Sequence, residues 1–198
     1  RLQDVVRGAT KELYSNGTNA EVTNAEALAS FDSDGFTVGN ASGYNQASDN
    51  FVAWCWKADP TVGFDIVSYV GNGTTKAVPH DLGVEPEFVI VKSRDSALGW
   101  PVWHTGYGKD RATYLNTNAA TAIDTQYWNN GGSWSSSQIV LGNRTDVNTN
   151  LDNYIAYIWA SVEGFSKFGS YKGNANVDGL FVYTGFKPSF VLAKSSSN

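Results

Sequence analysis

The side chains best suited to catalysis or metal binding are few in this chain of 198 residues, and they do not cluster along it. His80 and His104 are the only histidines, and neither belongs to a short metal-binding spacing such as HxxxH. Cys55, the single cysteine, alternates with two tryptophans in a stretch that has the pattern of a β-strand. We therefore predict that both histidines are polar turn residues and that the Cys55 thiol is buried among apolar groups.

Acidic residues come close together at two places without forming a recognisable site. Asp32 and Asp34 in "FDSDG" resemble the start of a calcium loop, but the further oxygen ligands and distal Glu of an EF-hand are missing. We predict a turn before a strand there. Glu85 and Glu87 flank Pro86, yet a glycosidase needs two carboxylates held at a defined separation. No catalytic residue, metal site or cofactor is predicted, and we expect a protein that is not an enzyme.

Aromatic side chains make up 14% of the chain and are the one feature that favours ligand binding. Flat rings in loops rich in glycine, asparagine and serine can stack on sugars while amides bind hydroxyls. Two segments have this composition, "GWPVWHTGYG" (99–108) and "QYWNNGGSWSSS" (126–137). The candidate glycan-stacking residues are Trp100, Trp103, Tyr107, Trp128 and Trp134. The alternative is that these rings cover a β-sheet core or a seam between subunits.

The elements that must position these residues occur twice, because nearly the whole chain is an internal repeat. "NFVAWCWKA" (50–58) has the same order of large, small and aromatic residues as "DNYIAYIWA" (152–160). "SYVGN" (68–72) matches "SYKGN" (170–174), and the match continues at a spacing of 102 residues to Ser93 and Ser195. Each unit has about 100 residues, which is the size of a domain rather than of a solenoid repeat.

Each unit has the pattern of short β-strands separated by polar turns. "GFDIVSYV" (63–70) and "FVIVKS" (88–93) are rich in β-branched and aromatic residues, and Asn72-Gly73 between them is typical of a hairpin. "FDSDGFTVGN" (31–40) and "SQIVLGN" (137–143) add a turn and a strand to the two units. The sequence therefore predicts an all-β fold of tandem antiparallel β-sandwich or jelly-roll units.

The repeat also predicts the domain boundaries. We expect residues 63–163 to form a complete central β-sandwich unit. Residues 1–62 would be the C-terminal part of a first unit, and residues 164–198 the N-terminal part of a further one. Strands from these two ends could close a second sandwich together.

Several longer strings carry a resemblance to a known family: "VRGATKELYSNGTNAEVT", "FDSDGFTVGN", "NFVAWCWKA", "IVSYVGNGT" and "LGVEPEFVIVKSR". Together they resemble a repeated domain of virion proteins from tailed bacteriophages, especially marine phages, including tail and fibre-like chains. The resemblance spans nearly all 198 residues and implies a concanavalin A or laminin-G type β-sandwich. It implies no catalytic residues. The second copy departs from the pattern at "GLFVYTGFKPSFVLAKS", where Val182 stands in place of His80.

The resemblance makes a structural virion protein the first expected function, as a tail fibre, an appendage or a capsid decoration with a host-recognition surface. A carbohydrate-binding module of an extracellular or cell-surface protein is the alternative, and a polysaccharide-degrading enzyme is a distant third. The expected location is the virion or the extracellular space.

Charge and hydropathy limit the partners. The formal net charge is −5 and only 17% of residues are charged, so a nucleic-acid surface is not expected. "GNGTT" (71–75) lacks the GK[ST] ending of a phosphate-binding loop. No stretch approaches the roughly 20 apolar residues of a membrane helix, so no membrane insertion is expected. Neither a Met nor a signal peptide begins the chain, so we expect it to be part of a longer polypeptide.

Paired aromatic residues lie on the two predicted strands that correspond in the repeat. Trp54 and Trp56 share one face of the strand predicted at 50–58, and Tyr157 and Trp159 occupy the same positions in the second copy. Because both faces of these strands are apolar, we predict that the four rings are structural packing residues and that Trp54 and Trp56 are largely buried. Incomplete units with uncovered apolar faces also predict a homo-oligomer, with a trimer as the first guess from the phage resemblance. Adjacent virion proteins and host surface glycans are the other expected partners.

Overall fold

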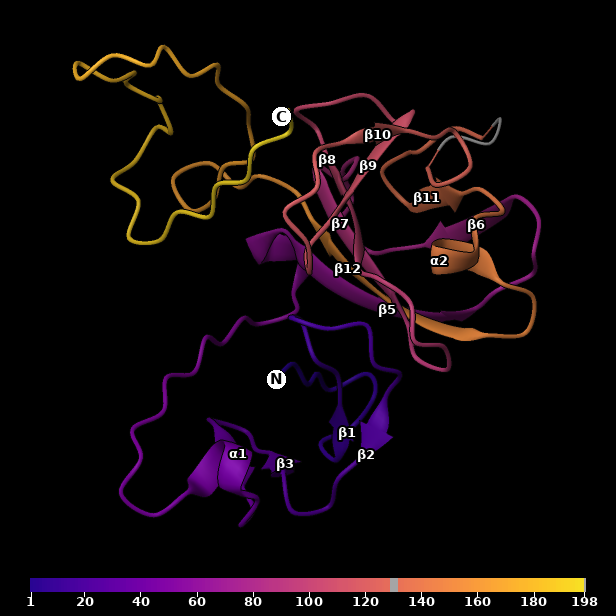
Figure 1. Cartoon of the computed structure of the whole chain (residues 1–198), viewed down its shortest axis with the longest axis vertical. Coiled ribbons are helices and arrows are strands. Elements are labelled where there is room, and N and C mark those ends of the chain that lie inside the picture. The colour runs from indigo at the N-terminus through magenta and orange to yellow at the C-terminus, as the bar shows by residue number, and fades with distance from the viewer. Residues whose placement is uncertain (129–131, 198) are drawn as a thin grey trace.

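The computed structural model describes residues 1–128 and 132–197, and most of its regular elements are β-strands (Figure 1). The fold is all-β with antiparallel sheets, as the sequence predicts. The helical pieces are short: α1 spans Ser42–Asn45, α2 spans Thr145–Asn148, and a 3₁₀ turn, η1, spans Pro60–Val62. Short helices agree with a sequence rich in glycine, asparagine and serine, which compete with helix formation.

The largest sheet has six strands in the order β10-β9-β8-β7-β12-β5. Its strands are β5 (Phe64–Val70), β7 (Phe88–Ser93), β8 (Pro101–His104), β9 (Arg111–Tyr114), β10 (Ala122–Ile123) and β12 (Asn153–Trp159). The strand β12 lies between β5 and β7 and is antiparallel to both. The strand β12 comes last in this region of the sequence and β5 comes first, yet the two are neighbours in the sheet.

A two-stranded sheet covers one face of the large sheet. It consists of β6 (Lys76–Pro79) and β11 (Gln138–Leu141). Because successive residues of a strand point to opposite faces, Val91 of β7 and Ile158 of β12 share this side of the large sheet. Val78 and Ile139 from the small sheet pack against them in one fully buried core. Figure 1 shows β6, β11 and α2 grouped beside the large sheet.

The N-terminal segment covers the opposite face of the large sheet. Ile90 of β7 and Ile155 of β12 point to this side and form a second core. Leu13, which is fully buried, lies in the same core, with Leu2 packed against it. The first residues of the chain thus contribute to the packing of the central strands.

Residues 10–48 repeat local features of residues 110–151. The strand β1 (Lys11–Glu12) pairs with β2 (Val22–Thr23), as β9 pairs with β10. A further hairpin joins β3 (Leu28–Phe31) to β4 (Phe36–Val38) and precedes α1, while β11 precedes α2.

Gly39 and Gly142 show this local repeat in atomic detail. The amide of Gly39 donates to the carbonyl of Ala27 at 2.6 Å, and that of Gly142 donates to Tyr127 at 2.9 Å. A Cβ atom at either glycine would clash with a backbone carbonyl oxygen, that of Glu26 or of Gln126 respectively. Both turns therefore require glycine for the same reason.

The strand predicted at residues 50–58 is absent, since this stretch has no regular structure. Trp54 and Trp56 are 71% and 58% exposed, and Cys55 is exposed as well. The predictions that the tryptophans are largely buried and that the thiol is buried are therefore wrong. The physical reason is a lack of partners: β12, the counterpart of this stretch, is held between β5 and β7, whereas residues 50–57 have no neighbouring strand.

The C-terminal residues 167–197 likewise contain no strand that the structure describes. Their counterparts in the central region are β5, β6 and β7, and their apolar side chains are left in solvent. Phe190 and Leu192, for example, are 61% and 68% exposed. Residues 50–58 and 167–197 therefore resemble strands of the central region in sequence, but they do not pair as strands in the structure.

The residues with possible chemistry lie apart from one another. His80 directly follows β6 and is buried, with its Nδ1 accepting a hydrogen bond from the amide of Leu82 at 3.3 Å. His104 is the last residue of β8 and is half-buried, so the prediction that it is a turn residue is wrong. Within residues 1–128 and 132–197, no three His, Cys, Asp or Glu side chains come together as metal ligands. None of the helices in this described part is long and apolar enough to cross a membrane.

Candidate functional site

The predicted glycan-stacking tryptophans are core residues. Trp100 and Trp128 have no exposed surface, and Trp103 and Trp134 are also buried. The prediction that these rings form an exposed platform is therefore wrong, because each lies beneath the layers that cover the large sheet. The neighbouring Asn129, Asn130 and Gly131, which belong to the same predicted glycan-binding segment, lie outside the described residues.

Trp100 joins the N-terminal loop to the central strands. Its Nε1 donates to the carbonyl oxygens of Tyr14 at 3.1 Å and Gly17 at 3.0 Å. Its own carbonyl accepts a hydrogen bond from the amide of Leu115 at 2.9 Å. A polar group on a buried indole needs such partners, and here the partners belong to the protein rather than to a ligand.

Trp103, Trp128 and Trp134 form an aromatic cluster in the core between the two sheets. The ring centroids of Trp103 and Trp134 are 4.6 Å apart, and Trp134 Nε1 donates to the carbonyls of Trp128 and Val140. Tyr107 packs against the edge of this core, and its hydroxyl donates to the Val102 carbonyl at 2.9 Å. Burial raises the pKa of this hydroxyl, so it stays neutral at ordinary pH.

Tyr157 and Trp159 pack on the second face of the large sheet. Tyr157 is buried, and Trp159 stacks on Phe64 of β5 with ring centroids 4.6 Å apart. Phe88 of β7 lies on the other side of Trp159 at 5.2 Å. The aromatic ring at the end of β12 is thus held between the two strands that flank it.

Charged residues form a network between the N-terminal segment and the sheet. Arg7 Nε lies 2.6 Å from Asp4 and its Nη1 lies 3.2 Å from Glu21. Arg94 binds the same glutamate with two bonds of 2.9 Å. The Tyr157 hydroxyl donates to Asp4, and burial raises the pKa of that hydroxyl well above its ordinary value. Each of these side chains is hydrogen-bonded or ion-paired to another member of the network. The network therefore fixes the N-terminal segment on the sheet and does not present a reactive side chain.

Lys92 of β7 is a buried cation outside this network. Its Nζ donates to the carbonyl oxygens of Ser93 at 2.8 Å and Ser96 at 3.2 Å. Burial lowers the pKa of the ammonium to about 8, against the attraction of the Asp146 carboxylate. An amine with this pKa could act as a base, but both described hydrogen bonds of Lys92 Nζ go to backbone carbonyl oxygens and hold the local structure.

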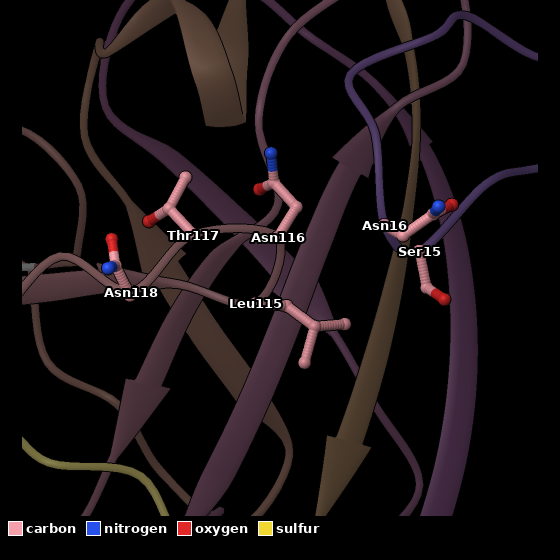
Figure 2. A pocket seen from close by; sticks show the side chains of 6 residues that line it. All are labelled: Ser15, Asn16, Leu115, Asn116, Thr117 and Asn118. Atoms are coloured by element: carbon pink, nitrogen blue, oxygen red, sulfur yellow. The ribbon is translucent and has the colours of Figure 1, made fainter.

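A hollow of about 470 Å³ lies between two loops that are counterparts in the repeat. Figure 2 shows Ser15 and Asn16 on one side and the loop from Leu115 to Asn118 on the other. Asn116 is partly occupied, because its Oδ1 accepts from the Trp100 amide at 3.0 Å. Thr117 Oγ1 likewise accepts from the Ala119 amide at 3.4 Å. The hydroxyl and amide groups of the lining can bind the hydroxyls of a polar ligand, but they cannot provide acid or base catalysis.

Exposed apolar residues gather in two segments, residues 50–57 and residues 166–195. We define the 50–57 segment and the C-terminal segment (residues 166–195) as the candidate assembly surface. Its exposed large apolar residues are Phe51, Val52, Trp54, Trp56, Tyr171, Val177, Leu180, Phe181, Val182, Tyr183, Phe190, Val191 and Leu192. Exposed apolar surface of this extent usually marks a contact with another chain or another domain.

Sequence reasoning missed both the hollow and the exposure of the ends. The hollow could have been found from the repeat itself, since "LYSN" at 13–16 and "TYLN" at 113–116 place a Tyr and an Asn at a spacing of 100 residues. The exposure of residues 50–57 and 190–195 could have been inferred from the repeat, because these counterparts of the paired strands β12 and β7 lie far apart in the sequence.

Comparison with known proteins gives one match. No curated protein and no solved structure matches the chain. One family model matches it over residues 1–198. The chain therefore belongs to the family described as "Domain of unknown function (DUF7483)".

Proposed function

We propose that the chain is a non-enzymatic structural component of a virion, located in a tail fibre, an appendage or a capsid decoration. The observation that carries this proposal is the candidate assembly surface, which exposes strand-like apolar sequence at both ends of a well-packed central region. Such surface is costly to leave in water and is stabilised by contact with further copies or neighbouring domains.

The proposed architecture is a tandem array of antiparallel β-sandwich units of the jelly-roll, concanavalin A-like type. The central unit would be residues 63–163, flanked by partial units at 1–62 and 164–198. Support comes from the strands of the two central sheets, which run from Phe64 to Trp159, and from the local geometry shared by α1 and α2.

The proposed partners are other copies of the chain, in a homo-oligomer for which a trimer remains the first guess, and adjacent virion proteins. Binding to a host surface glycan would be a secondary role of exposed loops.

Immunogold labelling of purified virus particles tests the structural role. An antibody raised against residues 63–163 should label particles at regular positions, and a cryo-EM map should contain the six-stranded sheet in symmetry-related copies. Particles that carry no copy of the chain would contradict the proposal.

Carbohydrate binding is the second candidate function, and the hollow between the two loops supports it. Its hydroxyl and amide groups suit a sugar, although the aromatic rings expected to stack on that sugar are buried. A glycan array should then show binding that is lost in Asn118→Ala and kept in Asn176→Ala, which changes an exposed amide away from the hollow. Equal binding by the two variants, or none by the wild type, would exclude this site.

A further inference from the structure

The internal repeat assigns a strand partner to each part of the candidate assembly surface. Residues 50–57 are the counterparts of β12 and the residue that follows it, at a spacing of 103. Residues 165–172 and 190–195 are the counterparts of β5 and β7. The spacing is 102 along β7, whereas along β5 it is 101 at Phe64 and 102 from Ser68 onward. In the central sheet, β12 lies between β5 and β7. The two ends of the chain therefore carry one complementary set of strands.

The observed pairing of β12 gives the register of this match. Ile158 lies opposite Asp65 of β5 and Val89 of β7. Transferring the spacing of 102 between β7 and residues 190–195 places Cys55 opposite Val191. Similarly, Trp159 lies opposite Phe88, so Trp56 would lie opposite Phe190.

Two pairs of side chains that would meet in this register are apolar and exposed, while Lys194 would lie opposite Val52. Phe190 and Trp56 would repeat the contact of Phe88 with Trp159, whose ring centroids are 5.2 Å apart. Leu192 would pack on Trp54 as Ile90 packs beside Tyr157.

No backbone-to-backbone hydrogen bond joins residues 50–57 or 169–195 to any residue of the described part of the chain. The amides and carbonyls of these residues can therefore form a ladder without breaking an existing one, whereas pairing at Ser166 would replace its two backbone bonds to Val162.

Contacts with the central region hold the C-terminal segment away from the 50–57 segment of its own chain. Phe168 stacks on Phe88 with ring centroids 5.5 Å apart, and Lys194 Nζ donates to the Thr117 carbonyl at 2.8 Å. Thr121 binds the carbonyl of Ser196 through both its amide and its hydroxyl. In Figure 1 the C-terminal segment lies at the upper end of the molecule, while the stretch after α1 lies at the lower end. No strand pairing joins the two segments within the described part of one chain.

We infer that the 50–57 segment of one copy inserts as a strand between residues 166–172 and 190–195 of a second copy. The contact is head-to-tail, so each copy offers one inserting strand and one receiving pair. Such contacts build a ring where they close and a filament where they do not, and both suit an extended virion structure. This inference rests on the proposed function, because it takes the candidate assembly surface to be a contact surface and names its partner as a second copy of the chain.

Disulfide trapping with the native Cys55 tests the register. Wild-type chain, whose only thiol is Cys55, is mixed under mild oxidation with the Cys55→Ser/Val191→Cys variant. Opposed residues of antiparallel strands have Cα atoms about 4.5–5.5 Å apart, a separation that a disulfide can bridge. We expect a covalent heterodimer linked between positions 55 and 191, identified by peptide mass.

The control is Cys55→Ser/Ser195→Cys, whose new thiol lies in the same exposed segment but opposite Phe51 in the inferred register. It should form roughly tenfold less link to Cys55, because disulfide geometry does not span the offset. Equal linkage at both positions, or no linkage at position 191, would overturn the inference.

A single variant, Val191→Cys with Cys55 retained, separates the two possible partners. A covalent dimer supports pairing between copies, whereas a monomer with an internal disulfide would show that the chain closes on itself and would overturn the inference. Neither outcome alters the particle-labelling result, so the inference can fail while the proposed structural role stands.

Discussion

The hydroxyl of Tyr157 in β12 donates a hydrogen bond of 2.7 Å to the carboxylate of Asp4, which lies 153 positions earlier in the chain. Removing this hydroxyl leaves a buried carboxylate with one partner fewer. We expect Tyr157→Phe to lower the free energy of unfolding by about 1–3 kcal/mol, measured by urea denaturation. Tyr183→Phe, at an exposed tyrosine, should change it by less than about 0.5 kcal/mol. Equal stability of the two variants would show that the contact contributes nothing to folding.

Trp100 and Trp54 should differ sharply on truncation. Trp100 is fully buried and donates two hydrogen bonds to the N-terminal loop, so Trp100→Ala should cost about 3–5 kcal/mol. Trp54→Ala should leave the stability of the isolated chain within about 0.5 kcal/mol. If Trp100→Ala does not fold, Trp100→Phe should still show a lowered melting temperature. A stable Trp100→Ala protein that merely lost glycan binding would restore the stacking hypothesis.

The buried Lys92 predicts a pH dependence of stability. Its pKa is lowered to about 8, whereas the pKa in the unfolded chain is about 10.4. Between these values the unfolded state binds more protons, so the contribution of Lys92 to stability rises with pH. We expect wild-type stability to increase relative to Lys92→Met from pH 7.5 to 9.5, by less than about 3 kcal/mol. Comparing the two proteins cancels the titration of the tyrosines, and a constant difference would contradict the prediction.

Fluorescence quenching should follow assembly through the two exposed tryptophans. In dilute protein, acrylamide should quench Trp54 and Trp56 readily, while the buried indoles stay protected. The quenchable fraction should fall as protein concentration rises, because the assembled form covers the 50–57 segment. A Trp54→Phe/Trp56→Phe variant should lack this change. A quenchable fraction that does not depend on concentration would contradict burial on assembly.

The sequence predicted the all-β class because alternation and turn residues are local properties of each strand. It also predicted turns that the structure contains, such as the one at Asp32, where the amide donates a hydrogen bond to the carbonyl of Gly35 at 2.9 Å. The exposure of Trp54 could not be predicted, because it depends on the lack of a neighbouring strand and not on the pattern of the stretch itself. The opposite error at Trp100 has the same cause: polar, glycine-rich sequence around an aromatic residue does not reveal that another segment covers it.

Sedimentation velocity of the wild-type chain, beside a Trp54→Ser/Trp56→Ser variant, tests the central claim of assembly most directly. We expect the wild type to form oligomers whose proportion grows with concentration in the micromolar range, while the variant remains monomeric. A wild-type chain that stays a monomer at micromolar concentration and unfolds cooperatively would contradict the claim, although the all-β fold would be unaffected.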